Sequence, residues 1–264
     1  MWYWYLALFL LGGSIVMKTN IYHITYTPTT GSVSLRFWGC NMSCHGCLCK
    51  EGIYDHLLKE NRLGNPPQTE NAFKPRRLLE LDEVLARLDE LKPQKVFLTG
   101  EEASLDPNYA AITQAFHDRY GCENVLYTNG FKMPALGDTD AVEVGIKAIS
   151  EELHQWYTER SVEPIKQNFI RYAHSEVKLT AASILIPGLV EIEEIERIAR
   201  FIAVINPDIP YFVLPYFPAG NNSWRKTSPY EVAEAVKRVS RYLTNVSGCQ
   251  GVEQEILHEV ERVV

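Results

Sequence analysis

Four cysteines lie close together and offer the clearest chemistry in the sequence. Cys40, Cys44 and Cys47 form a C-x3-C-x2-C pattern. Cys49 follows two residues after the last of them. Thiolates held this close repel one another unless a cation or a cluster binds them. A cubane cluster has four irons, so three cysteines leave one iron open to a substrate or cofactor. The spacing therefore favours an iron–sulfur cluster on the first three cysteines.

The main alternative for these cysteines is a structural zinc site with Cys49 as the fourth ligand. Structural zinc usually takes two pairs of ligands from separated segments, which a run as short as 40–49 does not provide. We therefore expect Cys49 to be a neighbour of the cluster rather than a ligand. Cys122 and Cys249 stand alone and are expected to be small core residues.

Composition limits the classes of protein that this chain can be. Its 264 residues are 46% hydrophobic and 22% charged, which excludes disordered and fibrous proteins. Clustered cysteines in a chain of this length favour a metal site in a reducing compartment, so we expect a cytoplasmic protein. The net charge of −7, without a basic run, gives no basis for nucleic-acid binding.

The first 16 residues are apolar and carry no charge. A spanning helix needs about 20 apolar residues, and a signal peptide begins with basic ones, so we expect no stable membrane span. Synthesis is expected to start at Met17, and a weak anchor or a buried extra segment are the alternatives. We divide the chain into an apolar N-terminal segment (1–19), a core domain (20–245) and a C-terminal tail (246–264).

Strand and helix patterns alternate from residue 20 onward, which indicates an α/β fold with a parallel sheet. Strands are expected at 33–38, 95–98, 124–127, 141–147, 177–186 and 211–214. Helices are expected at 77–91, 108–119, near 192–202 and at 228–244. Asp106 should be the N-cap of the second helix, with Pro107 at its first position. About six such units are fewer than the eight of a closed barrel.

The other residues with chemical potential follow the predicted carboxyl ends of these strands. Loops at these ends gather at one rim of a parallel α/β fold, where binding and catalysis take place. This convergence argues for an enzyme. The residues and segments are Cys40–Cys47, Thr99–Glu102, Thr128–Gly130, Lys147, Pro187-Gly188 and Pro215-Tyr216.

The cysteine loop and the order of the motifs after it resemble the radical S-adenosylmethionine (SAM) superfamily. Within that superfamily the chain is similar to the pyruvate formate-lyase activating enzymes, which activate glycyl-radical enzymes. The resemblance covers about residues 33–245. Its motifs are Thr99-Gly100-Glu101-Glu102, Thr128-Asn129-Gly130, Val144–Lys147, His154 with Tyr157-Thr158, Ile186-Pro187-Gly188 and Leu214-Pro215-Tyr216.

The resemblance implies a partial (β/α)6 TIM-like barrel of the radical SAM type. It implies a [4Fe-4S] cluster on Cys40, Cys44 and Cys47, with SAM on the open iron. The strand end at Thr99 and Gly100 would receive the SAM amino group. Glu102 is the matching carboxylate there, which suits an ammonium. Lys147 would face the SAM carboxylate, and Asn129 lies in the matching turn.

The same resemblance implies a reaction. Ferredoxin or flavodoxin would supply one electron, and SAM would be cleaved to methionine and a 5′-deoxyadenosyl radical. That radical would take hydrogen from a substrate, with a glycyl residue of a partner protein as the first expectation and a small metabolite as the second. The alternative from another class is a non-catalytic zinc- or iron–sulfur-binding interaction protein on an inherited barrel.

Several positions depart from the family pattern and weaken the inference to an activating-enzyme substrate. They are Gly46 for an aromatic residue, Glu101 for a glycine, Ala103 for a proline, Gly145 for an aspartate and Phe217 for a histidine. Taken singly, Glu101 and Glu102 could be a solvated loop pair. Lys147 could be a strand-end lysine and His154 a helix-surface residue. The cysteine loop favours a site role for Glu102 and Lys147, and leaves His154 open.

Overall fold

A computed structural model describes residues 17–51, 58, 75–219, 222–249 and 259–264. The expected start at Met17 concerns residues 1–16, which lie outside the described residues. The strands are β1 (Ile21–Thr27), β2 (Ser32–Phe37), β3 (Lys95–Gly100), β4 (Glu123–Thr128), β5 (Ala141–Gly145), β6 (Lys178–Leu185), β7 (Tyr211–Pro215), β8 (Val246–Gly248) and β9 (Glu261–Arg262). The helices are α2 (Leu81–Leu91), α3 (Tyr109–Tyr120), α4 (Glu151–Thr158), α5 (Glu163–Ala173), α6 (Ile192–Ile205) and α7 (Pro229–Val239), with short 3-10 turns η2 (Leu48–Glu51) and η3 (Ala103–Leu105).

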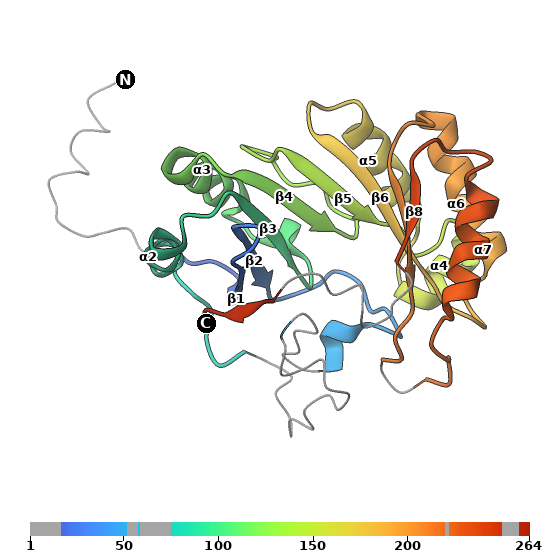
Figure 1. Ribbon diagram of the computed structural model, residues 1–264, viewed down its shortest axis with the longest axis horizontal. Coiled ribbons are helices and arrows are strands. Elements are labelled where there is room, and N and C mark those ends of the chain that lie inside the picture. The colour runs from blue at the N-terminus through green and yellow to red at the C-terminus, as the bar shows by residue number, and fades with distance from the viewer. Residues whose placement is uncertain (1–16, 52–57, 59–74, 220–221, 250–258) are drawn as a thin grey trace, which may run out of the picture.

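The strands form one curved sheet with helices on its outer side (Figure 1). The sheet order is β8-β7-β6-β5-β4-β3-β2-β1-β9. Every pair from β2 to β8 is parallel, whereas β1 pairs antiparallel with β2 and with β9. Within the described residues the first and last strands of this order are not paired with each other, so the barrel is open. This confirms the expected partial barrel.

Side chains that alternate along the strands bury one face of the sheet against the helices. On β3, Val96 and Leu98 are fully buried while Phe97 between them is not. The apolar stripe of α6 packs on this sheet, since Ile195, Ile198, Ala199 and Ile202 have no exposed surface. Phe97, on the opposite face, packs against Tyr127 of β4, with the ring centroids 5.5 Å apart.

Two helix starts differ from the expectations. Residues 77–80 are not helical: Leu79 donates its N–H to the carbonyl of Ile21, 2.7 Å away, so the chain runs beside β1 before α2 begins. Asp106 is not the N-cap of α3, which is Asn108. The Asp106 carboxylate instead accepts from the backbone N–H groups of Asn20 and Asn108. It thus joins the segment before β1 to the start of α3.

The segment 246–264, expected as a tail, contributes β8 and β9 to the sheet. The division of the chain at residue 245 stays a prediction. Cys122 is buried, as expected, but Cys249 is exposed, so its assignment to the core is wrong: it follows a short edge strand with little cover. Among the described residues no helix has the length and apolar character needed to cross a membrane.

Candidate active site

The cysteine loop runs from Trp38 to Cys47, directly after β2, and is fixed by the end of α4. The N–H groups of Ser43 and His45 donate to the carbonyls of Thr158 and Tyr157, at 2.9 and 3.1 Å. The last carbonyls of a helix have no partner within the helix, so these hydrogen bonds satisfy both the helix carbonyls and the N–H groups of the loop. Segments more than 110 residues apart thereby form one unit.

Side chains that follow two strand ends and α4 hold the same loop. Glu101, after β3, accepts the N–H of Gly39 at 2.7 Å. Asn129, after β4, donates to the side-chain oxygen of Asn41 at 2.7 Å. Arg160, after α4, donates to the carbonyl of Asn41 at 2.8 Å. The loop conformation is therefore set by the rim and not by the loop alone.

The Cys40 sulfur has two hydrogen-bond donors of the kind that a metal-bound thiolate needs. The Sγ of Cys40 accepts from the N–H of Met42 at 3.4 Å and from the side-chain amide of Asn129 at 3.6 Å. Cys40 is exposed as a whole residue, but desolvation by neighbouring atoms raises the pKa of its thiol to about 11, with further contributions from Glu102 and the other thiols. A bound metal would reverse this rise in pKa, because a coordinating thiol is deprotonated outright.

None of the six cysteines forms a disulfide. Cys49 lies beside the loop, where its thiol donates to the carbonyl of Gly100 at 3.4 Å and is hydrogen-bonded with Cys47. Among the described residues no three His, Cys, Asp or Glu side chains are close enough to hold a single metal ion. A cubane differs from a single ion, because each cysteine binds its own iron. The three thiols and the Cys40 donors fit such a cluster.

Glu102 lies at the centre of the hydrogen bonds that join two strand ends. It is 1% exposed, and its carboxylate accepts from Ser104 N at 3.2 Å, Thr128 Oγ1 at 2.7 Å and Asn129 N at 2.8 Å. Burial raises its pKa, and these donors oppose that effect. A carboxylate offers about four lone-pair sites. One therefore remains for a further donor, which is compatible with the predicted SAM ammonium.

Gly100 is required by the backbone. Its φ is +102°, and a Cβ there would lie 2.6 Å from the N and 2.7 Å from the O of Phe37. This close approach brings the end of β3, with Thr99, against the start of the cysteine loop. The glycine therefore fixes how the predicted SAM-binding strand end meets the cluster loop.

Lys147 follows β5 at the same rim. Its Nζ lies 3.3 Å from the position that a Cβ of Gly145 would take. The ammonium therefore lies where the side chain of the aspartate in the family pattern would begin. In the described part of the chain no ion pair within 4.0 Å involves Lys147. Its charge acts on the carboxyl of Glu143, where it opposes the effect of burial on the pKa.

His154 is fully buried in α4, so the surface interpretation of this residue is wrong. Its Nδ1 lies 2.7 Å from the carbonyl of Arg160, which can only accept, so Nδ1 is the donor. Burial lowers its pKa, which favours the neutral ring. His154 thus supports the turn after α4 that holds the cysteine loop.

Sequence reasoning missed one residue that fixes the start of α4. Glu194, in the first turn of α6, accepts from the N–H groups of Ile149 and Ser150 and from Ser150 Oγ, at 2.6 to 2.7 Å. It is 3% exposed. Nothing in its local sequence, a run of acidic residues at a helix start, distinguishes it from a solvated carboxylate.

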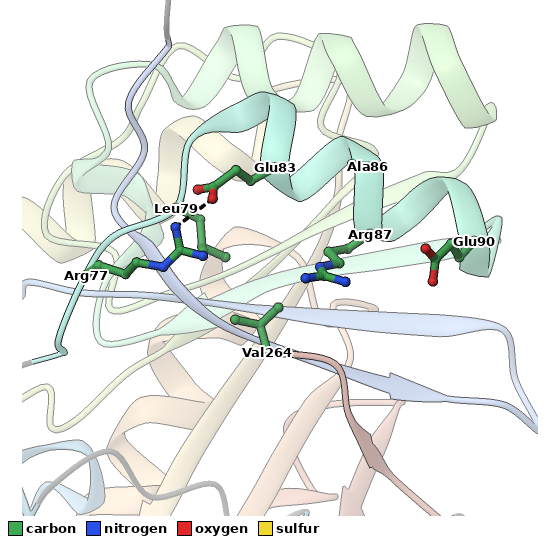
Figure 2. A pocket seen from close by; sticks show the side chains of 7 residues that line it. All are labelled: Arg77, Leu79, Glu83, Ala86, Arg87, Glu90 and Val264. Carbon is green, nitrogen blue, oxygen red and sulfur yellow. Dashed lines mark hydrogen bonds and ion pairs between the residues drawn. The ribbon is translucent and has the colours of Figure 1, made fainter.

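The structure thus brings the predicted strand-end residues together at one rim. A surface pocket lies elsewhere, beside α2, where Arg77 forms an ion pair with Glu83 (Figure 2). None of the predicted site residues lines that pocket. Its lining residues are Arg77, Leu79, Glu83, Ala86, Arg87, Glu90 and Val264.

An open α/β barrel with a three-cysteine loop after its first parallel strand defines the class of protein. Residues 37–202, more than half of the chain, match the Radical SAM superfamily, and the chain belongs to it. Proteins of this superfamily bind a [4Fe-4S] cluster and SAM. A Methanocaldococcus jannaschii relative with the name "Putative glycyl-radical enzyme activating enzyme" is 26% identical over 237 residues, which are 85% of this chain and 83% of the relative.

Two solved structures show the same fold at low identity. SuiB of Streptococcus suis, bound to the precursor peptide SuiA, has a TM-score of 0.58 and 11% identity over 80% of this chain. The match covers 46% of SuiB, so this chain spans about half its length. TYW1, solved with a lysine–pyruvate adduct bound, has a TM-score of 0.57 and 13% identity, over 81% of this chain and 74% of TYW1.

Proposed function

We propose that the protein is a radical SAM enzyme of the activating-enzyme type. Its cluster would be held by Cys40, Cys44 and Cys47, and its substrate would be a glycyl residue of a partner protein. The observation that carries this proposal is the cysteine loop itself, which the ends of β3, β4 and α4 hold in place at the rim. Such a loop is built to present three thiols to one cofactor.

The chemistry of the bound group is simple to state. When bound, the cluster would supply one electron, received from ferredoxin or flavodoxin, for the cleavage of SAM to methionine and a 5′-deoxyadenosyl radical, which would take hydrogen from the substrate. The residues of the chain position the reactants. Asn129 donates to the Cys40 ligand, Glu102 keeps one lone pair for the SAM ammonium, and Lys147 offers its cation to the SAM carboxylate.

Two observations support a protein substrate. The methanogen relative has a name that refers to glycyl-radical enzymes, and the match extends over most of both chains. SuiB, which shares the fold, was solved with a peptide bound.

We place the core domain at residues 20–245 and the protein in the cytoplasm, where thiols stay reduced.

Deuterium transfer distinguishes a glycyl substrate from a small metabolite. Extract from the source cells, grown with glycine deuterated at its α-carbon, is divided into a protein fraction and a small-molecule fraction. Each fraction is incubated anaerobically with the reconstituted, reduced enzyme and SAM, and the 5′-deoxyadenosine is analysed by mass spectrometry. We expect deuterium only with the protein fraction. Transfer only from the small-molecule fraction would contradict the activating-enzyme assignment.

A further inference from the structure

Four aromatic rings pack together where the ends of β6 and β7 approach the cysteine loop. We call Trp156, Tyr157, Tyr216 and Trp224 the aromatic cluster. The Trp224 ring lies at its centre, with centroids 6.2 Å from Trp156, 5.9 Å from Tyr157 and 6.0 Å from Tyr216. All three pairs are near perpendicular, a favourable arrangement for aromatic rings.

This cluster is seated on the cysteine loop at Gly46. A Cβ on Gly46 would lie 3.0 Å from the Trp224 ring and 3.2 Å from the Tyr216 ring. Even a methyl group there would force the rings to move. A Cβ on Gly188, after β6, would also lie 3.8 Å from the Trp224 ring. The glycine between Cys44 and Cys47 therefore provides the space into which Trp224 fits.

The hydrogen bonds at the end of β7 hold the neighbouring backbone in place. Thr227 Oγ1 donates to the carbonyl of Leu185 at 2.6 Å and accepts the N–H of Tyr216 at 2.9 Å. Asn222 accepts the N–H of Trp224 at 3.0 Å. Because these bonds connect the ends of β6 and β7, Trp224 reaches the cysteine loop from a fixed base.

The position of Tyr157 relates the aromatic cluster to the thiols. The carbonyl of Tyr157 accepts the N–H of His45 at 3.1 Å, and a Cβ on Gly46 would lie 3.0 Å from the Trp224 ring. His45 and Gly46 lie between Cys44 and Cys47, so the aromatic cluster contacts the part of the loop that joins these two cysteines. Among the strands that the structure describes, no pairing joins β7 or β8 to β2, so the sheet itself does not connect these parts.

We propose that Trp224, seated on Gly46, is a positioning residue that holds the cysteine loop against the far side of the barrel and keeps water from Cys44 and Cys47. This inference rests on the proposed function, because that function places the iron–sulfur cluster on the cysteine loop. It accounts for the glycine at a position where the resemblance predicts an aromatic residue: the ring comes from another part of the chain. An apolar cover of this kind limits solvent access to a metal site.

Cluster loss, measured independently of activity, tests the proposal. Full-length protein is reconstituted anaerobically with iron and sulfide, an iron chelator is added, and the decay of the cluster absorbance is followed. We expect Trp224→Ala to lose the iron–sulfur cluster several-fold faster than the parent. Trp224→Phe should lose it at a rate close to that of the parent. Phe217→Ala is the matched control, because it removes an exposed aromatic side chain that follows the same strand, packs against Lys226 and is not among the nearest neighbours of Gly46.

Decay of Trp224→Ala at the parental rate would overturn the proposal, as would equal acceleration by Phe217→Ala. If no variant, including the parent, binds iron, the proposed function fails and not this inference alone. Circular dichroism confirms that each variant is folded before the decay is compared.

A double-mutant cycle keeps the test valid even if Trp224→Ala folds poorly. Gly46→Ala should accelerate cluster loss in the parent, because its methyl group displaces the Trp224 ring. In Trp224→Phe, whose smaller ring leaves more room, the same substitution should accelerate loss of the iron–sulfur cluster less. Equal acceleration in both backgrounds would show that Gly46 and Trp224 act independently, which contradicts the proposal.

Discussion

Each residue of the rim has a contact that predicts what its loss would do. Cys44 lies in the spacing that binds the cluster, whereas Cys49 donates its thiol proton to the carbonyl of Gly100. We expect Cys44→Ala to abolish iron binding and SAM cleavage, and Cys49→Ala to retain both. Iron content and 5′-deoxyadenosine formation in anaerobic preparations measure this. Loss of iron from the Cys49 variant would show that Cys49 is a ligand.

Glu102 joins the ends of β3 and β4, and its charge has a structural role. In Glu102→Gln an amide nitrogen replaces one acceptor, so a buried N–H or O–H of the chain loses its partner. Such a loss costs about 2 kcal/mol of unfolding free energy. Urea denaturation of apo protein measures it, with Glu152→Gln, an exposed residue of α4, as the control. A stability equal to that of the control would contradict the role of Glu102 between the strands.

At the scale of elements, α4 is the support on which the cysteine loop rests, and α6 holds α4. Burial would raise the pKa of Glu194, but hydrogen bonds from Ser150, Arg197 and Ile149 outweigh it and lower the pKa below its ordinary value of 4.5. A depressed pKa in the folded state stabilises the protein above 4.5, and this contribution is lost as the pH falls through the folded value.

We therefore expect Glu194→Gln to lower stability near neutral pH and to reduce the loss of stability on acidification. The glutamine cannot titrate, so its unfolding free energy should change less between pH 6 and pH 3 than that of the parent. Chemical denaturation at several pH values measures the two slopes. Parallel pH dependence in parent and variant would show that Glu194 does not titrate with folding.

Not every element could be predicted from the sequence, and the reasons are physical. The strong stripe of α6 was predictable because isoleucines recur at helical spacing. Helix α4 was missed because its buried face consists of His154, Tyr157 and Thr158, which do not form an apolar pattern. Strands β8 and β9 have three and two residues, too few for a recurring pattern.

At the scale of the whole molecule, the pattern of strands and helices predicted an α/β fold with a parallel sheet, and the strand ends predicted which residues gather at its rim, because these are local signals. The partial barrel was implied by the family resemblance. How those residues hold one another was not predictable. The contact of Asn129 with Cys40 joins positions 89 residues apart, and the seat of Trp224 on Gly46 joins even more distant ones. Tertiary packing alone brings such pairs together, so no local pattern could show them.

One measurement tests the central claim most directly. The full-length protein is purified anaerobically, reconstituted with iron and sulfide and reduced with dithionite in the presence of SAM, and 5′-deoxyadenosine is followed by chromatography. The account predicts about four irons per chain and formation of 5′-deoxyadenosine that depends on both SAM and reductant. Zinc in place of iron, with no cleavage of SAM, would contradict it and would make the cysteine loop a structural metal site.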